Sequence, residues 1–499
     1  MELKFEKTPC RCLRRVTWEV QNLEQTQEIR IPDGLPDIGR VLCAWGQVIL
    51  RSKEWRGDGM SASGGIMVWV LFAPDDGSQP QCVDAWLPFQ AKWNFPETQR
   101  EGVIRLVPLL RSVDARTVSA RKMMVRAGVG ILGEALEPYE EAVCNPGELP
   151  EEVEILRHTY PMKLPKEAGE KTFLLDEELT LPSSCPAAEK ILRFELLPQL
   201  QDSKVMAGKM VFRGNGLLHV LYRGQNGELT GWDFEIPFSQ FGELEGEFGP
   251  DAAARTSIAV TSLELDLTEE GALRLKCGLV AQYVVSDQIL LELAEDAYSP
   301  HREVVPNFQE LALPAILDER SEQKAGEMPF EVECARVVDV SFMPDHPRMS
   351  RMGDQVSGEL TGIFQLLYED NSGSLQCAAR RWEQQWSFDA SDDSAIALDM
   401  APEGLPSAMV NGGRVTVKGN VSLATRTEAE RGQQVLIGME VGDVKQLDQN
   451  RPSLILRRAE GERLWDLAKG CGTTVAAICQ ANQLQAEPAQ GQMLLIPVL

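Results

Sequence analysis

Histidine and cysteine are the side chains of this sequence best suited to nucleophilic, acid–base or metal chemistry near neutral pH. The four histidines lie far apart in the chain, at His158, His219, His301 and His346. His219 alternates with Leu218 and Val220, so we expect it on the other face of a strand, in a structural or surface role. The chain contains no P-loop, G-x-S-x-G or H-E-x-x-H pattern. We therefore predict a non-catalytic protein, with no metal site and no cofactor.

Cysteine occurs 11 times, an odd number, and no two cysteines form a C-x-x-C pair. Cys10 and Cys12 are the one close pair outside the C-terminal segment, and two thiols alone are a weak signal for a metal site. The spacing predicts reduced, mostly buried thiols, as is usual for a protein of the cytosol.

The chain of 499 residues is strongly acidic, with 75 Asp and Glu against 49 Lys and Arg and a net charge of −26. Such a chain repels nucleic acid and anionic lipid, so we predict neither as a partner. The first residues, MELKFEKTPCRCLRR, lack the apolar core of a secretory signal, and no run of about 18 apolar residues predicts a transmembrane helix. The length favours three or four domains.

An alternating strand that ends on an aromatic residue occurs three times, at offsets of 150 and 146 residues. Its apolar members are Val68, Val70 and Phe72, then Leu218, Val220 and Tyr222, then Phe364, Leu366 and Tyr368. Alternation with one apolar face predicts a half-buried strand. Each strand is followed five residues later by a glycine, Gly77, Gly227 or Gly373, with Asp or Asn close by. This pattern predicts a tight hairpin, because glycine readily adopts a positive φ.

Further strand signals follow each hairpin, so each unit of about 150 residues holds six or so strands. The sequence predicts a mainly β fold with three antiparallel, sandwich-like domains at residues 1–150, 151–300 and 301–450, the third divergent. The Pro- and Glu-rich stretches 135–171 and 299–329 are expected to be linkers that can pack back as short helices. A polar boundary at 446–452 precedes the C-terminal segment.

Residues 453–499 carry a separate pattern of strand, helix, helix and strand. A short apolar run at 454–456 is followed by apolar residues at helical spacing, and Gly470 and Gly472 then signal the end of a helix. Thr474 is placed to cap a second helix, and the apolar run 493–496 predicts the closing strand.

This segment resembles the LysM family. The matching residues run in order through it, as Gly461-Glu462-Arg463-Leu464, Trp465, Leu467-Ala468, Thr474-Val475, Asn482-Gln483-Leu484 and Gly491-Gln492-Met493-Leu494-Leu495-Ile496-Pro497. The resemblance implies a βααβ domain with two helices on one face of a two-stranded sheet. Most members of the family bind N-acetylglucosamine-containing glycans between the loop that enters the first helix and the loop that leaves the second.

The resemblance places the binding loops at Gly461, Glu462, Arg463, Leu464, Gln480, Ala481, Asn482, Gln483 and Leu484. Where the family has Asp-Thr, this chain has Glu462-Arg463, so a long cation replaces a small hydroxyl in the implied groove. We therefore expect a protein partner at these loops, with peptidoglycan as the alternative. Arg463 is the expected contact, because interface hot spots favour arginine.

The three upstream units resemble the SPOCS family of endospore-forming bacteria. The resemblance rests on Ile31-Pro32 and Pro36-Asp37-Ile38, on the strand ends Leu71-Phe72, Leu221-Tyr222 and Leu367-Tyr368, and on the strand pair at 112–131. It implies a scaffold of spore-coat assembly in the mother-cell cytoplasm, at the forespore surface. Its LysM segment would dock the coat's morphogenetic ATPase or another coat protein. Two alternatives stay open: a cell-wall protein that binds peptidoglycan, and a hydrolase whose site the sequence does not reveal.

Overall fold

The protein is mainly β, with 76% of its residues in strands and a βααβ segment at the C-terminus, as the sequence predicts. The computed structural model describes residues 2–98, 101–147, 149–150, 152–412, 414–446 and 451–499. Most of the predicted boundary at 446–452 therefore lies outside the described residues. Among the helices of these ranges, none combines the length and the apolar character that crossing a membrane requires.

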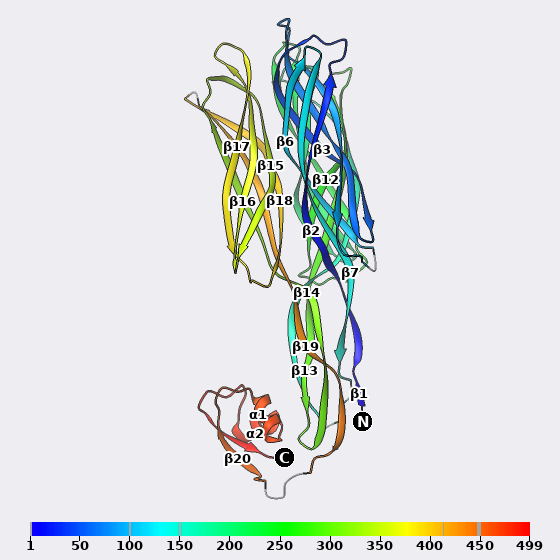
Figure 1. Cartoon of the computed structure of the whole chain (residues 1–499), viewed down its shortest axis with the longest axis vertical. Helices are drawn as coiled ribbons and strands as arrows, with labels where there is room; N and C mark the ends of the chain where they lie inside the picture. The colour runs from blue at the N-terminus through cyan, green and yellow to red at the C-terminus, as the bar shows by residue number, and fades with distance from the viewer. Residues whose placement is uncertain (1, 99–100, 148, 151, 413, 447–450) are drawn as a thin grey trace.

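Three sets of strands repeat one order of connections (Figure 1). The first set comprises β2 (Glu6–Arg30), β3 (Ile38–Arg56), β4 (Gly59–Pro74), β5 (Gln81–Asn94), β6 (Val103–Ser119) and β7 (Lys122–Asn145). The second comprises β8 (Glu154–Leu179), β9 (Ala188–Met206), β10 (Lys209–Gly224), β11 (Leu229–Glu243), β12 (Ala253–Leu267) and β13 (Leu273–Tyr298). The third comprises β14 (Arg302–Phe330), β15 (Cys334–Met352), β16 (Gln355–Asp370), β17 (Leu375–Asp389), β18 (Ala395–Asn411) and β19 (Arg414–Val444).

Each set has two antiparallel layers that enclose a core, and the second layers of the second and third sets join, with β1, into one seven-stranded sheet through the pairing of β8 with β14. A three-stranded meander, such as β3-β4-β5, makes one sheet, and the first strand joins the closing hairpin, as in β2-β7-β6, to make the other. In the first set, Val68 and Val70 of β4 pack in one cluster with Val125 and Val129 of β7. The hairpin glycines Gly77, Gly227 and Gly373 all have positive φ, between 75° and 84°. The alternating strands and their tight turns are thus confirmed.

The prediction that these alternating strands are half-buried is wrong. Leu71 of β4, Leu221 of β10 and Leu367 of β16 lie on the other face of their strands, and each is at most 1% exposed. They belong to one cluster that draws residues from all three sets. The second face of each meander is therefore buried against the neighbouring sets, at what we call the three-way junction.

The long strands of the three sets continue below the sandwiches as a stalk (Figure 1). It consists of the paired ribbons β2–β7, β8–β13 and β14–β19, whose side chains share one core. That core contains Cys10, Cys12, Leu164, Leu293 and Leu313, among others. The expectation of linkers with short helices at 135–171 and 299–329 is therefore wrong, because strands β7, β8 and β14 cover most of both stretches. The short strand β1 (Glu2–Lys4) pairs with β19 in the stalk.

The C-terminal segment has β20 (Leu454–Arg458), α1 (Leu464–Cys471), α2 (Val475–Asn482) and β21 (Met493–Pro497). Its signals act as predicted, except that Gly470 lies within α1 and Gly472 alone ends it. Gly472 ends α1 in the left-handed conformation, and the Thr474 side chain accepts a hydrogen bond from the backbone N–H of Ala477 at the start of α2. Strands β20 and β21 pair antiparallel. The segment lies beside the lower end of the stalk (Figure 1).

Candidate functional site

The predicted binding loops lie at the start of α1 and at the end of α2. Five of the nine residues are exposed: Gly461, Arg463, Gln480, Ala481 and Gln483. Glu462, Asn482 and Leu484 are half-buried, and Leu464 is buried in the core of the segment. The loops therefore offer one cation and two amides to a partner, whereas Leu464 supports the fold.

Two side chains hold these loops in place. The carboxylate of Glu487 accepts a hydrogen bond from the backbone N–H of Leu464 at 2.8 Å, which links the chain after α2 to the start of α1. The Asn482 amide donates to the carbonyl oxygen of Leu495 and accepts from its N–H, at 2.6 and 2.7 Å. The two loops are thus fixed by bonds within the segment, so a partner would meet a preformed surface.

Charges on the first loop are paired locally. Arg463 lies on an exposed surface and donates to both carboxylate oxygens of Asp466, at 3.0 and 3.3 Å. Arg457 pairs with Glu462 at 2.8 Å. Backbone N–H groups lower the pKa of Glu462 below its usual value, and the Arg457 guanidinium lowers it further. Since exposed ion pairs contribute little free energy, Arg463 can exchange Asp466 for a carboxylate of a partner.

The segment is mounted on the end of β13 by one face of α1. The rings of Tyr298 and Trp465 meet edge to face, with centroids 4.8 Å apart, and the Tyr298 hydroxyl donates to the carbonyl oxygen of Thr473 at 2.9 Å. Asp296 accepts from the Trp465 indole N–H and from Lys469, both at 2.8 Å. Burial would raise the pKa of Asp296, but the bonds from Lys469 and Trp465 lower it, so the carboxylate stays ionised. Trp465 is therefore a core residue, as predicted, of a core shared with the stalk.

A buried ion cluster, which the sequence analysis did not identify, joins the three strand sets. Glu134 of β7 is fully buried and accepts hydrogen bonds from Arg105 of β6, Arg255 of β12 and Arg426 of β19, at 2.6 to 3.1 Å. Asp399 of β18 accepts from Arg105 and Arg255 at 2.7 to 2.8 Å. Burial would raise the pKa of Glu134, but Arg255, Arg105 and Arg426 hold it well below its usual range. The cluster therefore carries fixed charges between the sets.

A second group of buried charges lies at the three-way junction. Arg193 of β9 pairs with Asp339 of β15 at 2.9 Å, and Asp339 also faces the ring of His219 at 3.0 Å. The other ring nitrogen of His219 lies 2.6 Å from Asp233. Burial lowers the pKa of His219, but Asp339 and Asp233 raise it more, to about 9. His219 is thus structural, as expected, and it is charged at neutral pH.

The repeat offset was the signal that could have revealed these charges. Arg105 and Arg255 are 150 residues apart, the offset found between the alternating strands. Cys43, Arg193 and Asp339 lie opposite Leu71, Leu221 and Leu367, respectively, in the three meanders. These three residues occupy equivalent positions in the three units. They can come close together only if the three meanders pack against one another.

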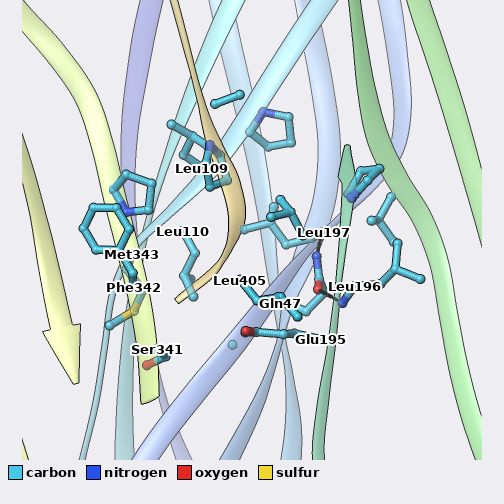
Figure 2. Close-up of a pocket in the computed structure, with 18 of the residues that line it drawn as sticks. Gln47, Leu109, Leu110, Glu195, Leu196, Leu197, Ser341, Phe342, Met343 and Leu405 are labelled. Carbon is cyan, nitrogen blue, oxygen red and sulfur yellow. Dashed lines mark hydrogen bonds between the residues drawn. The ribbon is translucent and has the colours of Figure 1, made fainter. Parts of the chain in front are cut away.

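A cavity of about 190 Å³ lies where the three sets meet (Figure 2). Its lining is mostly apolar and includes Leu110, Leu197, Phe342 and Leu405. The side-chain oxygen of Gln47 already accepts from the backbone N–H of Leu196 at 3.0 Å. The Ser341 hydroxyl donates to Gln365, and Glu195 pairs with Arg193, so these polar groups of the lining serve the protein's own fold and we assign the cavity no ligand. Within the described ranges, no group of three or more His, Cys, Asp or Glu side chains is placed to hold a metal ion.

Comparison with known proteins gives one match. The family model described as "SipL, SPOCS domain" matches residues 187–268, which span β9 to β12 of the second strand set. These residues are therefore a SPOCS domain, which points to a role in assembly of the spore coat. Neither the curated proteins nor the solved structures contain a match to this chain.

Proposed function

We propose that this protein is a non-catalytic scaffold of endospore coat assembly that docks a protein partner through its LysM-like C-terminal segment. The SPOCS match at residues 187–268 carries the proposal. We extend the SPOCS assignment to the first and third strand sets, as domains at 1–150, 151–300 and 301–450, because all three sets share one strand order. We place the protein in the mother-cell cytoplasm, at the forespore surface, with the coat's morphogenetic ATPase or another coat protein as partner.

The architecture supports a division of labour between scaffold and docking module. The three sandwiches are tied together by buried ion pairs, as expected of a rigid body. The C-terminal segment lies at the end of the stalk opposite the sandwiches (Figure 1). Its side chains Arg463, Gln480 and Gln483 are exposed. Arginine in a fixed, exposed loop is a common hot spot, since it pairs bidentately with a carboxylate.

The test is a pull-down of the partner from sporulating cells with the full chain and two variants. Arg463→Ala should lose at least tenfold in retained partner. Arg458→Ala is the matched control, because Arg458 is an exposed arginine of the same segment on β20 whose side chain donates to the carbonyl oxygen of Gly491, outside the predicted loops. If Arg463→Ala retains as much partner as the control, the loops are not the docking site.

The glycan alternative is tested by co-sedimentation of the full chain with purified peptidoglycan. We expect the chain to stay in the supernatant, because Glu462-Arg463 stands where the family's small hydroxyl would meet a sugar. Pelleting that chito-oligosaccharide reverses would instead show that the loops bind glycan. A zymogram on peptidoglycan tests the hydrolase alternative, which any clearing would revive.

A further inference from the structure

Two cysteines from different strand sets are in contact. Cys43 lies on β3 of the first set and Cys377 on β17 of the third, 334 residues apart in sequence. Their sulfur atoms are 2.6 Å apart, and both thiols are reduced in the structure. A disulfide bond holds its sulfur atoms at about 2.05 Å, so only a small approach separates this contact from a bond.

Independent contacts hold the two strands at this distance. Arg40 of β3 donates to the carbonyl oxygen of Leu375 at 2.9 Å and to the side-chain oxygen of Gln376 at 3.2 Å, immediately before Cys377. Cys43 is buried in the cluster of the three-way junction, and Cys377 packs against the same cluster. The contact therefore belongs to the packing of the two sets, and does not depend on the sulfur atoms alone.

The place of this contact in the chain gives it a distinct role. The polypeptide itself joins the first set to the second and the second to the third, through the residues between β7 and β8 and between β13 and β14. No such covalent link joins the third set back to the first. A bond between Cys43 and Cys377 would close the three sets into a covalent ring at the three-way junction.

We propose that Cys43 and Cys377 form a reversible disulfide when the protein meets a peroxide. The half-buried Cys377 is the thiol that a small oxidant reaches first. Its thiolate displaces hydroxide from hydrogen peroxide to give a sulfenic acid, and the released hydroxide takes up the thiol proton as water. The Cys43 sulfur then attacks the sulfenic sulfur, forms the S–S bond and expels a second water. Two thiols and one peroxide thus become one disulfide and two waters.

Burial of Cys43 slows this reaction. Burial, reinforced by the neighbouring Cys377, raises the pKa of Cys43 well above its usual value. The neutral thiol reacts slowly, so the pair stays reduced in a reducing cytosol and is oxidised on sustained exposure. The proposal concerns the strand sets and does not depend on what the C-terminal segment binds.

The experiment is peptide mapping of the full chain after hydrogen peroxide treatment under native conditions, followed by alkylation and tryptic digestion without reductant. Trypsin should release Cys43 and Cys377 in the peptides 41–51 and 352–380, each of which holds one cysteine. We expect a linked pair of these peptides, lighter by two hydrogen atoms than their sum, that separates on reduction. The link should be absent from Cys43→Ser and from Cys377→Ser.

Cys82→Ser is the matched control, because Cys82 is buried in the same cluster as Cys43. This variant should keep the 41–51 to 352–380 link. A link from Cys43 to Cys82, a link between two chains, or alkylation of both Cys43 and Cys377 after oxidation would each overturn the proposal.

A second measurement needs no substitution. The oxidised wild-type chain should unfold at a higher temperature than the same chain after reduction, by a few degrees, because the bond closes a loop of more than three hundred residues in the unfolded state. The Cys82→Ser variant should show the same difference. Equal unfolding temperatures for the oxidised and reduced forms would contradict ring closure.

Discussion

The contacts between the three strand sets and the attachment of the C-terminal segment both rely on ion pairs, but the two places bury these pairs to very different degrees. The carboxylates of Glu134 and Asp339 are fully shielded from water, Glu134 between three arginines and Asp339 between Arg193 and His219. At the attachment, the Lys469 side chain keeps 43% of its exposure while it pairs with Asp296. Breaking a buried pair leaves an uncompensated charge, whereas breaking an exposed one leaves a hydrated side chain. The ion pairs between the strand sets therefore cost more free energy to break than the ion pair that attaches the C-terminal segment to the stalk.

The largest effect that this comparison predicts is that of Glu134→Gln. The change removes the buried charge that Arg105, Arg255 and Arg426 share, so the free energy of unfolding should fall by about 3–5 kcal/mol. Denaturant unfolding followed by fluorescence measures it. The control is Glu24→Gln, which breaks the exposed pair with Arg126 and should leave stability unchanged. Similar losses in the two variants would mean that burial does not distinguish them.

The next effect concerns pH and His219. Its folded pKa of about 9 lies above the ordinary value of 6.5, so the protonated ring stabilises the fold fully below pH 6.5. That contribution, on the order of 2–3 kcal/mol, should be lost as the pH rises to 9, as the proton leaves the site between Asp233 and Asp339.

The measurement is the unfolding free energy across this pH range. In His219→Gln the decline should flatten, whereas His158→Gln, which alters a half-exposed histidine of the stalk, should keep it. If the unfolding free energy of His219→Gln fell as much with pH as that of the wild type, groups other than His219 would cause the decline.

At the attachment, Tyr298→Ala should free the segment without unfolding the sandwiches. The change removes the ring contact with Trp465 and the bond to Thr473, which are the main apolar and neutral contacts described there. We expect faster tryptic cleavage after Lys445, ahead of the C-terminal segment, and an unchanged unfolding temperature of the β sandwiches. The matched control is Tyr139→Ala, which removes a tyrosine of β7 in the stalk, outside the attachment, and should leave the cleavage rate unchanged. Unchanged cleavage in Tyr298→Ala would show that the segment is fixed by other contacts.

The smallest effect is expected from Lys469→Ala. Because this lysine is half-exposed, its pair with Asp296 should contribute under about 1 kcal/mol to the attachment. The cleavage assay should therefore respond weakly, and raised salt should produce a similar change in the wild type. If Lys469→Ala increased cleavage as much as Tyr298→Ala, the attachment would depend mainly on the ion pair with Asp296.

The sequence predicted those parts of the fold that depend on local patterns. The alternating strands, the hairpin glycines and the caps of α1 and α2 were all found, because each is governed by neighbouring residues. The stalk was mistaken for linkers because its strands carry Pro161, Pro165, Pro306 and Pro314. A two-stranded ribbon tolerates proline, since one side of each strand needs no hydrogen bond from it.

The contacts between the strand sets could not be predicted from local sequence patterns. Arg105, Arg255 and Asp399 resemble surface charges in an acidic chain, and their burial follows only when the three sets assemble. The predicted loops extend into the helices, because Leu464 begins α1 and Gln480, Ala481 and Asn482 are the last residues of α2, whereas Arg463 is exposed just before α1. Their binding role stays a prediction. Leu464 and Asn482 proved to have structural contacts that a motif match cannot separate from binding contacts.

The unbroken strands of the stalk also have a mechanical consequence. β8 pairs with β13 from Glu154 to Leu179, and β14 pairs with β19 over a similar length, so each ladder runs from the sandwiches to the stalk's far end. A pull on the C-terminal segment through Tyr298 would act along these strands. Hydrogen bonds loaded in this direction resist together as a shear bond, whereas those of a peeled hairpin yield one at a time. The molecule can therefore carry tension between its two ends, and its light attachment would part before its body unfolds.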